Sequence, residues 1–141
     1  IGYHTISKYM GANCAIINEV ELRHELKDKH SNIKNLIPKL SKKFKIKFLV
    51  VTVGKNGSYG YDIKKNNLYY CPAFAKEVVD RLGAGDAYLS VFSAVYTLGI
   101  KDLRLLMLIA SLGTLEVIKG LGNSNSVNYK SLLKSIVYLI K

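Results

Sequence analysis

The sequence predicts an α/β fold in which helices flank a mostly parallel sheet, and three patterns carry this prediction. Residues 48–53 form a continuous run rich in β-branched side chains, which is typical of a parallel strand covered on both faces. Residues 14–17 form a short apolar run that leads into a polar-faced helical segment over residues 19–29. Gly83 and Gly85 precede a long apolar segment that should be a buried helix. With 141 residues, 49% of them hydrophobic, we expect residues 1–141 to form a single domain.

The remaining elements follow from periodicity and from turn-forming residues. Residues 1–11 favour a strand plus a turn. Apolar residues recur at helical spacing over residues 31–45, where Pro38 should kink or interrupt the helix. Strands over residues 57–62 and 68–71 should form a short hairpin flap. Helices should follow at residues 86–98, 102–119 and 129–140, with Gly99 as a C-cap and Asn128 as an N-cap.

The chain is strongly basic, with a net charge of +11 from 21 Lys and Arg against 10 Asp and Glu. Such a charge would suit a polyanionic partner. Most of the lysines, however, are scattered over residues 27–47 without the aromatic interleaving of a nucleic-acid stacking platform. We interpret them as a solvated basic face and expect no nucleic-acid partner.

Cysteine spacing and hydropathy bear on where the protein resides. Cys14 and Cys71 are isolated thiols with neither metal-ligand spacing nor a disulfide framework, which fits a reducing compartment. The longest uncharged run, residues 87–100, is shorter than the ~18 residues that a membrane-spanning helix needs. We therefore expect a cytoplasmic protein with no membrane partner. Because the chain does not begin with Met, we also expect it to be part of a longer polypeptide.

The turn at residues 83–86 has the character of an anion site. Gly83 and Gly85 lack a Cβ, so the backbone can adopt positive φ and approach a ligand closely. A helix that starts near Asp86 would direct its first N–H groups and its positive dipole end to the same place. The residues alone leave two interpretations of Asp86 open: a general base, or an ordinary helix N-cap.

The segment from Asp80 to Asp86 reads Asp-Arg-Leu-Gly-Ala-Gly-Asp and resembles the DTxGAGD signature of the ribokinase-like (PfkB) carbohydrate kinases. It departs from the signature at Arg81, where Thr is usual. The resemblance implies that Gly83, Ala84 and Gly85 form the anion hole for the transferred phosphoryl group. It also implies that Asp86 deprotonates the acceptor hydroxyl, which favours the general base over the cap.

Two further motifs resemble the nucleotide-binding elements of this family. Asn18-Glu19-Val20-Glu21 resembles NxxE, which implies a nucleotide contact for Asn18 and a magnesium role, through water, for Glu21; an ordinary N-cap is the alternative for Asn18. The stretch Thr52-Val53-Gly54-Lys55-Asn56-Gly57 resembles TxGxxG, which implies nucleotide contacts for Thr52, Gly54 and Gly57. A plain hairpin turn is the alternative there, and both interpretations can hold at once.

The resemblance also extends to the second half of the chain. It implies a monovalent cation site, potassium being the candidate, that uses Asp80 and the backbone of Gly120, Gly122 and Ser126; a linker is the alternative for residues 120–127. Ser111 falls where relatives often place an Asn against the adenine, which puts adenine contact at that position in doubt.

Together the three motifs imply the C-terminal, nucleotide-binding half of a ribokinase-like, Rossmann-type sandwich. The implied activity is ATP-dependent, magnesium-assisted transfer of the γ-phosphate to a carbohydrate hydroxyl. The alternative is a catalytically incomplete nucleotide-binding fragment or interaction module that lacks the sugar-binding half. The expected partners are a nucleotide and a carbohydrate, with a homodimer, or fusion to a nucleotidyltransferase domain, as the candidate assembly.

Overall fold

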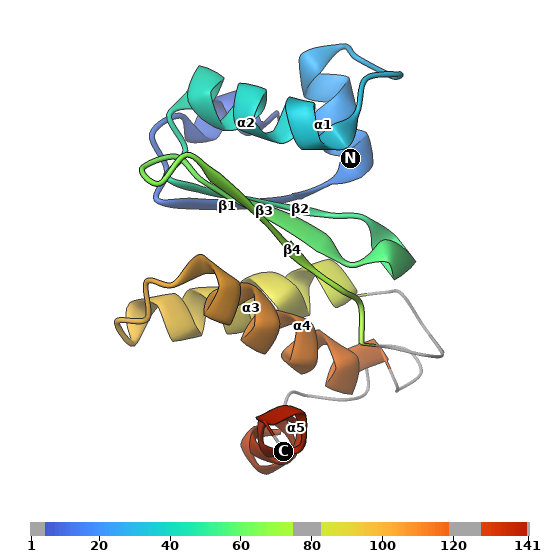
Figure 1. The fold of residues 1–141 in the computed structure, drawn as a ribbon, viewed down its shortest axis with the longest axis vertical. Helices are drawn as coiled ribbons and strands as arrows, with labels where there is room; N and C mark the ends of the chain where they lie inside the picture. The colour runs from blue at the N-terminus through green and yellow to red at the C-terminus, as the bar shows by residue number, and fades with distance from the viewer. Residues whose placement is uncertain (1–4, 75–82, 119–127, 141) are drawn as a thin grey trace. The chain divides into compact units, whose positions relative to one another are not determined.

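The computed structural model describes residues 5–74, 83–118 and 128–140, and the chain divides into two compact units (Figure 1). Unit 1 comprises Ile1–Pro72 and unit 2 comprises Ala73–Lys141. Each unit is described by itself below. The single domain over residues 1–141 stays a prediction.

Unit 1 is built on a four-stranded sheet in the order β1-β2-β3-β4. The strands are β1 (Cys14–Asn18), β2 (Phe48–Thr52), β3 (Ser58–Asp62) and β4 (Asn67–Cys71). Strands β1 and β2 pair in parallel, whereas β3 and β4 add a hairpin by antiparallel pairing. The predicted α/β class and the hairpin flap are confirmed, whereas the sheet of unit 1 is mixed, with one parallel and two antiparallel pairings, and is not mostly parallel as predicted.

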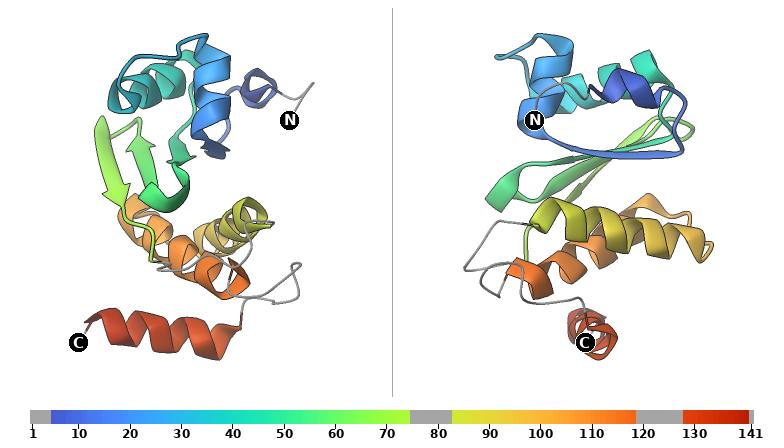
Figure 2. Two further views of the ribbon diagram at one scale, coloured as in Figure 1. Left: turned by 90° about the vertical axis from the view of Figure 1, so that its right-hand side faces the viewer. Right: turned by 180° about the vertical axis from the view of Figure 1, so that it is seen from behind.

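Two helices, α1 (Glu19–Leu26) and α2 (Ile33–Phe44), lie on one face of this sheet (Figure 2). Leu49 and Val51 of β2 project toward the helices because alternate residues of a strand share a face. The core between the layers is apolar and consists of Ile6, Leu22, Leu36, Ile37, Leu40, Phe44, Ile46, Leu49, Val51 and Tyr61.

Helix α2 is continuous through Pro38, contrary to a possible break there. Its end is fixed by Ser41, whose buried hydroxyl donates to the carbonyl of Ile46 at 2.8 Å. The described part of residues 1–11 also differs from the predicted strand plus turn. It contains a 3₁₀ helix, η1 (Ile6–Tyr9), because Ile6 packs into the core as part of a short turn of helix.

Unit 2 contains α3 (Ala84–Thr97), α4 (Leu103–Ile118) and α5 (Tyr129–Ile140). All three helices were predicted, and Asn128 caps α5 by accepting from the Lys130 N–H at 2.9 Å. Helix α3 is not buried all round as predicted, since Leu89 and the adjoining Leu98 are exposed. Apolar content alone did not reveal that this helix keeps a face in solvent.

Helices α3 and α4 approach closely where Gly113 faces Val91. A Cβ at Gly113 would lie 2.7 Å from Val91 Cγ2, which is closer than real Cβ contacts allow. Nearby, the buried hydroxyl of Tyr88 donates to the carbonyl of Met107 at 3.4 Å. The glycine therefore sets the distance between the two helices.

We predict that Gly113→Ala lowers the free energy of unfolding by about 1–3 kcal/mol, because the added methyl overpacks the contact with Val91. In a Val91→Ala background both Cγ atoms are removed and only the 3.3 Å contact with the Cβ of residue 91 remains, so the same change should cost at least ~1 kcal/mol less. Denaturant unfolding of the four proteins measures both effects. An equal loss of stability on Gly113→Ala in both backgrounds would contradict this packing.

Candidate active-site residues

Asn18 and Glu21 form a reciprocal capping box at the start of α1. The Glu21 N–H donates to Asn18 Oδ1 at 2.8 Å, and the Asn18 N–H donates to Glu21 Oε2 at 2.9 Å. The cap interpretation of Asn18 is thus confirmed. Both side chains are exposed, and within the described residues Glu21 Oε1 has no hydrogen-bond partner. The box therefore fixes the carboxylate by one oxygen and leaves the other directed to solvent.

The carboxyl ends of β1 and β2 are held side by side. Asn18 and Thr52 are partners in the parallel register, and the Thr52 hydroxyl donates to the carbonyl of Ile17 at 3.4 Å. Because parallel strands end at the same edge of a sheet, the NxxE and TxGxxG segments begin next to each other. The sheet brings these two sequence-predicted motifs together.

A tight turn, η2 (Gly54–Asn56), follows β2. Gly54 and Gly57 have φ of 53° and 84°, a region that favours glycine. The turn is closed by the Val53 N–H, which donates to the carbonyl of Gly57 at 2.8 Å, and β3 then begins at Ser58. The hairpin interpretation of this segment is confirmed, and the glycines leave its backbone accessible.

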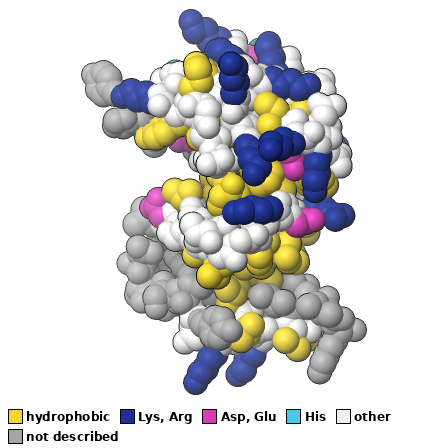
Figure 3. Space-filling model, turned by 90° about the vertical axis from the view of Figure 1, so that its left-hand side faces the viewer, with side chains coloured by type: hydrophobic (Ala, Val, Ile, Leu, Met, Phe, Trp, Pro, Cys, Tyr) yellow, Lys and Arg dark blue, Asp and Glu magenta, His cyan; other side chains and the backbone are white. Residues whose placement is uncertain are grey.

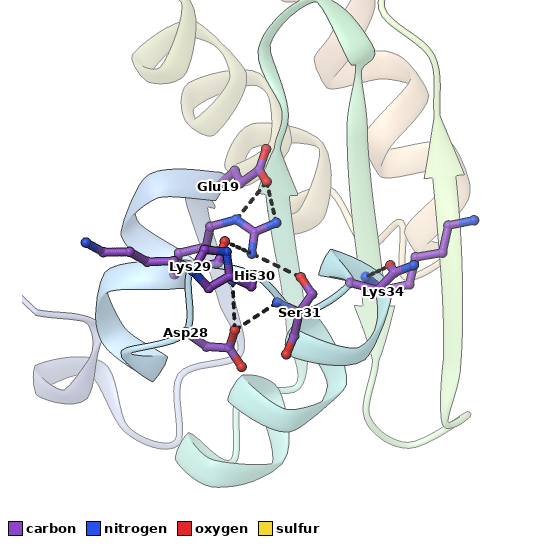
Figure 4. Close-up of polar contacts among 8 residues, drawn as sticks. Glu19, Asp28, Lys29, His30, Ser31 and Lys34 are labelled. Atoms are coloured by element: carbon purple, nitrogen blue, oxygen red, sulfur yellow. Dashed lines mark hydrogen bonds and ion pairs between the residues drawn. The ribbon is translucent and has the colours of Figure 1, made fainter.

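Arg23 of α1 holds the loop between α1 and α2 in place, although the sequence motifs did not identify this residue. Its guanidinium contacts Glu19 at 2.8 Å and donates to the carbonyls of Lys29 and Ser31, so that α1 holds the loop to α2 (Figure 4). In the same loop, Asp28 accepts from the Ser31 and His30 N–H groups, which lowers the pKa of its carboxyl. The i,i+4 spacing of Glu19 and Arg23 was the available signal.

The second group of predicted residues lies at the start of α3. Gly83 is the N-cap, in the left-handed conformation with φ of 76°, and Ala84 is the first helical residue. Asp86 is therefore in the first turn and is not the N-cap, so the cap alternative for Asp86 is wrong. Its carboxylate is exposed and finds no hydrogen bond or ion pair within the described residues.

Gly85 is a glycine that the fold itself does not explain. It has helical backbone geometry, and a Cβ built on it would meet no described atom within 4 Å. A glycine in a helix is less stable than alanine by roughly 0.5–1 kcal/mol. The open space where a Cβ would stand, beside helix N–H groups that lack intrahelical partners, is what a closely approaching anion requires.

Of the remaining predicted site residues, only Ser111 lies in the part of the chain that the structure describes. Ser111 is half-buried within α4. Asp80, Gly120, Gly122 and Ser126, proposed for a monovalent cation, lie outside the described residues. Across the described parts of the chain, no group of three or more His, Cys, Asp and Glu side chains gathers around a common point. No helix there is long and apolar enough to cross a bilayer.

Comparison with protein families places residues 4–111 within the family described as pfkB family carbohydrate kinase. The bifunctional protein HldE of Helicobacter pylori strain HPAG1 is 33% identical over 101 residues, covering 68% of this chain and 21% of the relative. The HldE of Campylobacter jejuni subsp. jejuni serotype O:6 is 33% identical over 98 residues, with 67% and 21% covered. The chain thus spans about a fifth of the length of these curated relatives.

Solved structures show the same fold. Phosphofructokinase-2 from Escherichia coli, in complex with substrates and products, matches with a TM-score of 0.81 at 16% identity, over 96% of this chain and 44% of that protein. Arabidopsis thaliana ribokinase, complexed with ribose and ATP, matches with a TM-score of 0.75 at 22% identity, over 86% of this chain and 40% of that protein. At these identities the match speaks for the fold alone.

Proposed function

The chain belongs to the pfkB family of carbohydrate kinases, and from that premise we propose that it supplies the nucleotide-binding and phosphoryl-transfer part of a sugar kinase. The proposed reaction is ATP-dependent transfer of the γ-phosphate to a carbohydrate hydroxyl. One observation carries the proposal. The first turn of α3 joins a glycine with open space at its Cβ position, Gly85, to an exposed carboxylate, Asp86.

ATP would supply the phosphoryl group, and Mg²⁺ would neutralise charge on its phosphates. In unit 1, Thr52, Gly54 and Gly57 are the proposed nucleotide contacts, because their turn has accessible backbone at the end of β2. Asn18 is proposed as a further nucleotide contact through its amide. Glu21 is proposed to orient water around magnesium through Oε1, since magnesium keeps most of its water and needs few direct protein ligands.

In unit 2, the backbone N–H groups at Gly83, Ala84 and Gly85 are the proposed anion hole. Donors that are fixed before the reaction stabilise developing negative charge without reorganising. Asp86 is proposed as the base that takes the proton from the acceptor hydroxyl. Its exposure and its lack of a cap role support this assignment, because the carboxylate makes no hydrogen bond or ion pair within the described residues.

Further assignments rest on the family resemblance alone. These are potassium at Asp80, Gly120, Gly122 and Ser126, and a nucleotide contact at Ser111, where Ser stands in place of the Asn that relatives often have. Fusion to a nucleotidyltransferase domain is proposed because the curated relatives are bifunctional proteins that extend well beyond this chain.

A second candidate is a nucleotide-binding unit that lacks catalysis on its own. The length of the chain favours this candidate, because the chain matches only about two fifths of the length of the solved kinases that share its fold. Sugar phosphorylation by the isolated chain should then be slow or absent, whereas Mg-ATP binding should persist. Isothermal calorimetry together with a coupled kinase assay distinguishes the two candidates.

We predict that Gly85→Ala raises stability and weakens Mg-ATP binding. Alanine suits the helical backbone and meets no described atom, so the free energy of unfolding should rise by roughly 0.5–1 kcal/mol. The same methyl group occupies the proposed anion site, so the affinity should fall about tenfold or more, equivalent to ~1.4 kcal/mol. Ser93→Ala, at an exposed position of the same helix, is the control. Unchanged affinity in Gly85→Ala would remove the anion-hole assignment.

Glu21→Gln separates the cap from the proposed magnesium role. Glutamine also serves at this position of a capping box, so we predict that stability changes little. The magnesium dependence of ATP binding should weaken, because the negative charge that orients the metal's water shell is lost. Glu21→Ala removes both roles and should additionally lower stability by about 1 kcal/mol. An unchanged magnesium dependence in Glu21→Gln would confine Glu21 to capping.

Asp86→Asn tests the proposed base with nearly the same side-chain volume. In the full-length protein, we predict that kcat falls by at least ~10²-fold, the usual contribution of a general base. Nucleotide affinity should be kept, and stability should fall by no more than ~1 kcal/mol through the lost charge at a helix start. Near-normal kcat would exclude Asp86 as the base.

A further inference from the structure

Three segments that are far apart in the sequence meet at one end of unit 1. The Gly11 N–H donates to the carbonyl of Phe44 at 2.8 Å, which joins the end of η1 to the end of α2. Lys42 Nζ lies 6.0 Å from the ring centroid of Tyr61, and the Tyr61 hydroxyl bonds Asn66 in the β3–β4 turn. This end is therefore formed by residues 9–11, 42–45 and 64–66.

Five exposed lysines gather there, and we call them the lysine cluster: Lys42, Lys43, Lys45, Lys64 and Lys65. Figure 3 views the side on which the β3–β4 turn lies in Figure 1, and it shows many Lys and Arg side chains with few carboxylates. No ion pair involves the five lysines within the described parts of the chain.

The carboxylates of unit 1 do not offset this charge. Asp62 is only 3% exposed, and its Oδ1 accepts from the backbone N–H groups of Lys64 and Lys65, at 2.9 and 3.2 Å. Every other described carboxylate of the unit belongs to α1 or to the loop that follows it. The positive charge of the cluster therefore faces solvent.

Two large apolar side chains are exposed at the same end of unit 1. Tyr9 is 59% exposed and Met10 is 62% exposed, at the end of η1 next to Phe44. Their exposure is unusual because the rest of η1 contributes Ile6 to the core. The same end of the unit thus combines two exposed apolar side chains with five exposed lysines.

We propose that this end docks reversibly on an anionic membrane surface. The lysines would meet lipid phosphates, each contributing about 1 kcal/mol or about fivefold in binding near such a surface. Tyr9 suits the headgroup level and Met10 suits the edge of the acyl region. Such docking departs from the sequence-based expectation of no membrane partner. That expectation rests on the lack of a spanning segment, which docking on a surface does not need.

The docking end is separate from the candidate nucleotide-binding residues. The register pairs Phe48 with Asp62 at one end of β2, and Thr52 with Ser58 at the other. Five residues of extended strand span roughly 13 Å at ~3.3 Å per residue. Docking through the lysine cluster would therefore leave the Asn18 and Thr52 end of the sheet accessible.

A lipid surface fits this end better than a nucleic acid does. All five cationic groups are lysines, which act as point charges, whereas readers of nucleic acids favour the planar fork of arginine. Single-strand binding also uses successive exposed rings for base stacking. Here Tyr61 and Phe44 are buried, and the exposed pair is one tyrosine and one methionine.

The test is flotation of the full 141-residue chain with vesicles of equal parts phosphatidylglycerol and phosphatidylcholine, and with phosphatidylcholine alone. We expect binding to the anionic vesicles only, falling steeply as salt is raised from about 0.05 M to about 0.5 M. Lys64→Glu with Lys65→Glu should lower the partition coefficient by at least about 25-fold. Met10→Ser should weaken binding without changing its salt dependence.

The matched control is Lys130→Glu with Lys134→Glu on α5, which makes the same change in net charge at exposed positions elsewhere. Equal losses in the two double variants, or no binding to anionic vesicles at low salt, would overturn the proposal. So would tighter binding to a single-stranded oligonucleotide than to the vesicles. Circular dichroism checks that each variant folds. If the Lys64→Glu, Lys65→Glu variant does not fold, Lys42→Glu with Lys43→Glu replaces it.

Discussion

The parallel pairing of β1 with β2 is the constraint on which the candidate site in unit 1 depends. Its register sets Asn18 opposite Thr52, and the Thr52 hydroxyl ties the two strand ends through the carbonyl of Ile17. At this edge, β1 is followed by the capped helix α1, and β2 is followed by the glycine turn that precedes β3. A slip of one residue would invert the faces of β1 and separate the two motifs.

The proposed functional groups in unit 1 also have structural tasks, whereas in unit 2 Gly85 and the Asp86 carboxylate make no contact within the described residues that the fold requires. Glu21 uses one carboxylate oxygen to complete a capping box and presents the other to solvent. Gly85 fills no tight contact, and the Asp86 carboxylate caps nothing within the described residues, although its charge suits the start of a helix. Residues that a fold does not need are strong candidates for function, because their cost in stability requires another explanation.

Charge is distributed unevenly over unit 1. The described carboxylates other than the buried Asp62 belong to α1 and its following loop, where Asp28 and Arg23 organise the backbone. Lysines occupy the end of α2 and the β3–β4 turn. One end of the sheet thus carries the nucleotide motifs, and the other carries a basic surface with two exposed apolar side chains. The two proposed partners, a nucleotide and an anionic membrane, would therefore use opposite ends of the sheet.

The sequence by itself determined the elements and the family. The apolar run at β2, the helical spacing of apolar residues in α2 and the three motifs are local patterns. Such patterns can be recognised in a short segment, because the repeat of a helix or strand fixes which residues share a face. Only the tertiary structure decided which alternatives hold at single residues. The structure shows that Asn18 is the N-cap of α1 and that Asp86 is not the N-cap of α3. The sequence could not decide this, because an N-cap is assigned only when the first residue of the helix is known. The tertiary structure also joined the segment after η1 to the end of α2 through the bond from the Gly11 N–H to the Phe44 carbonyl, since contacts between distant segments arise only when the core is packed.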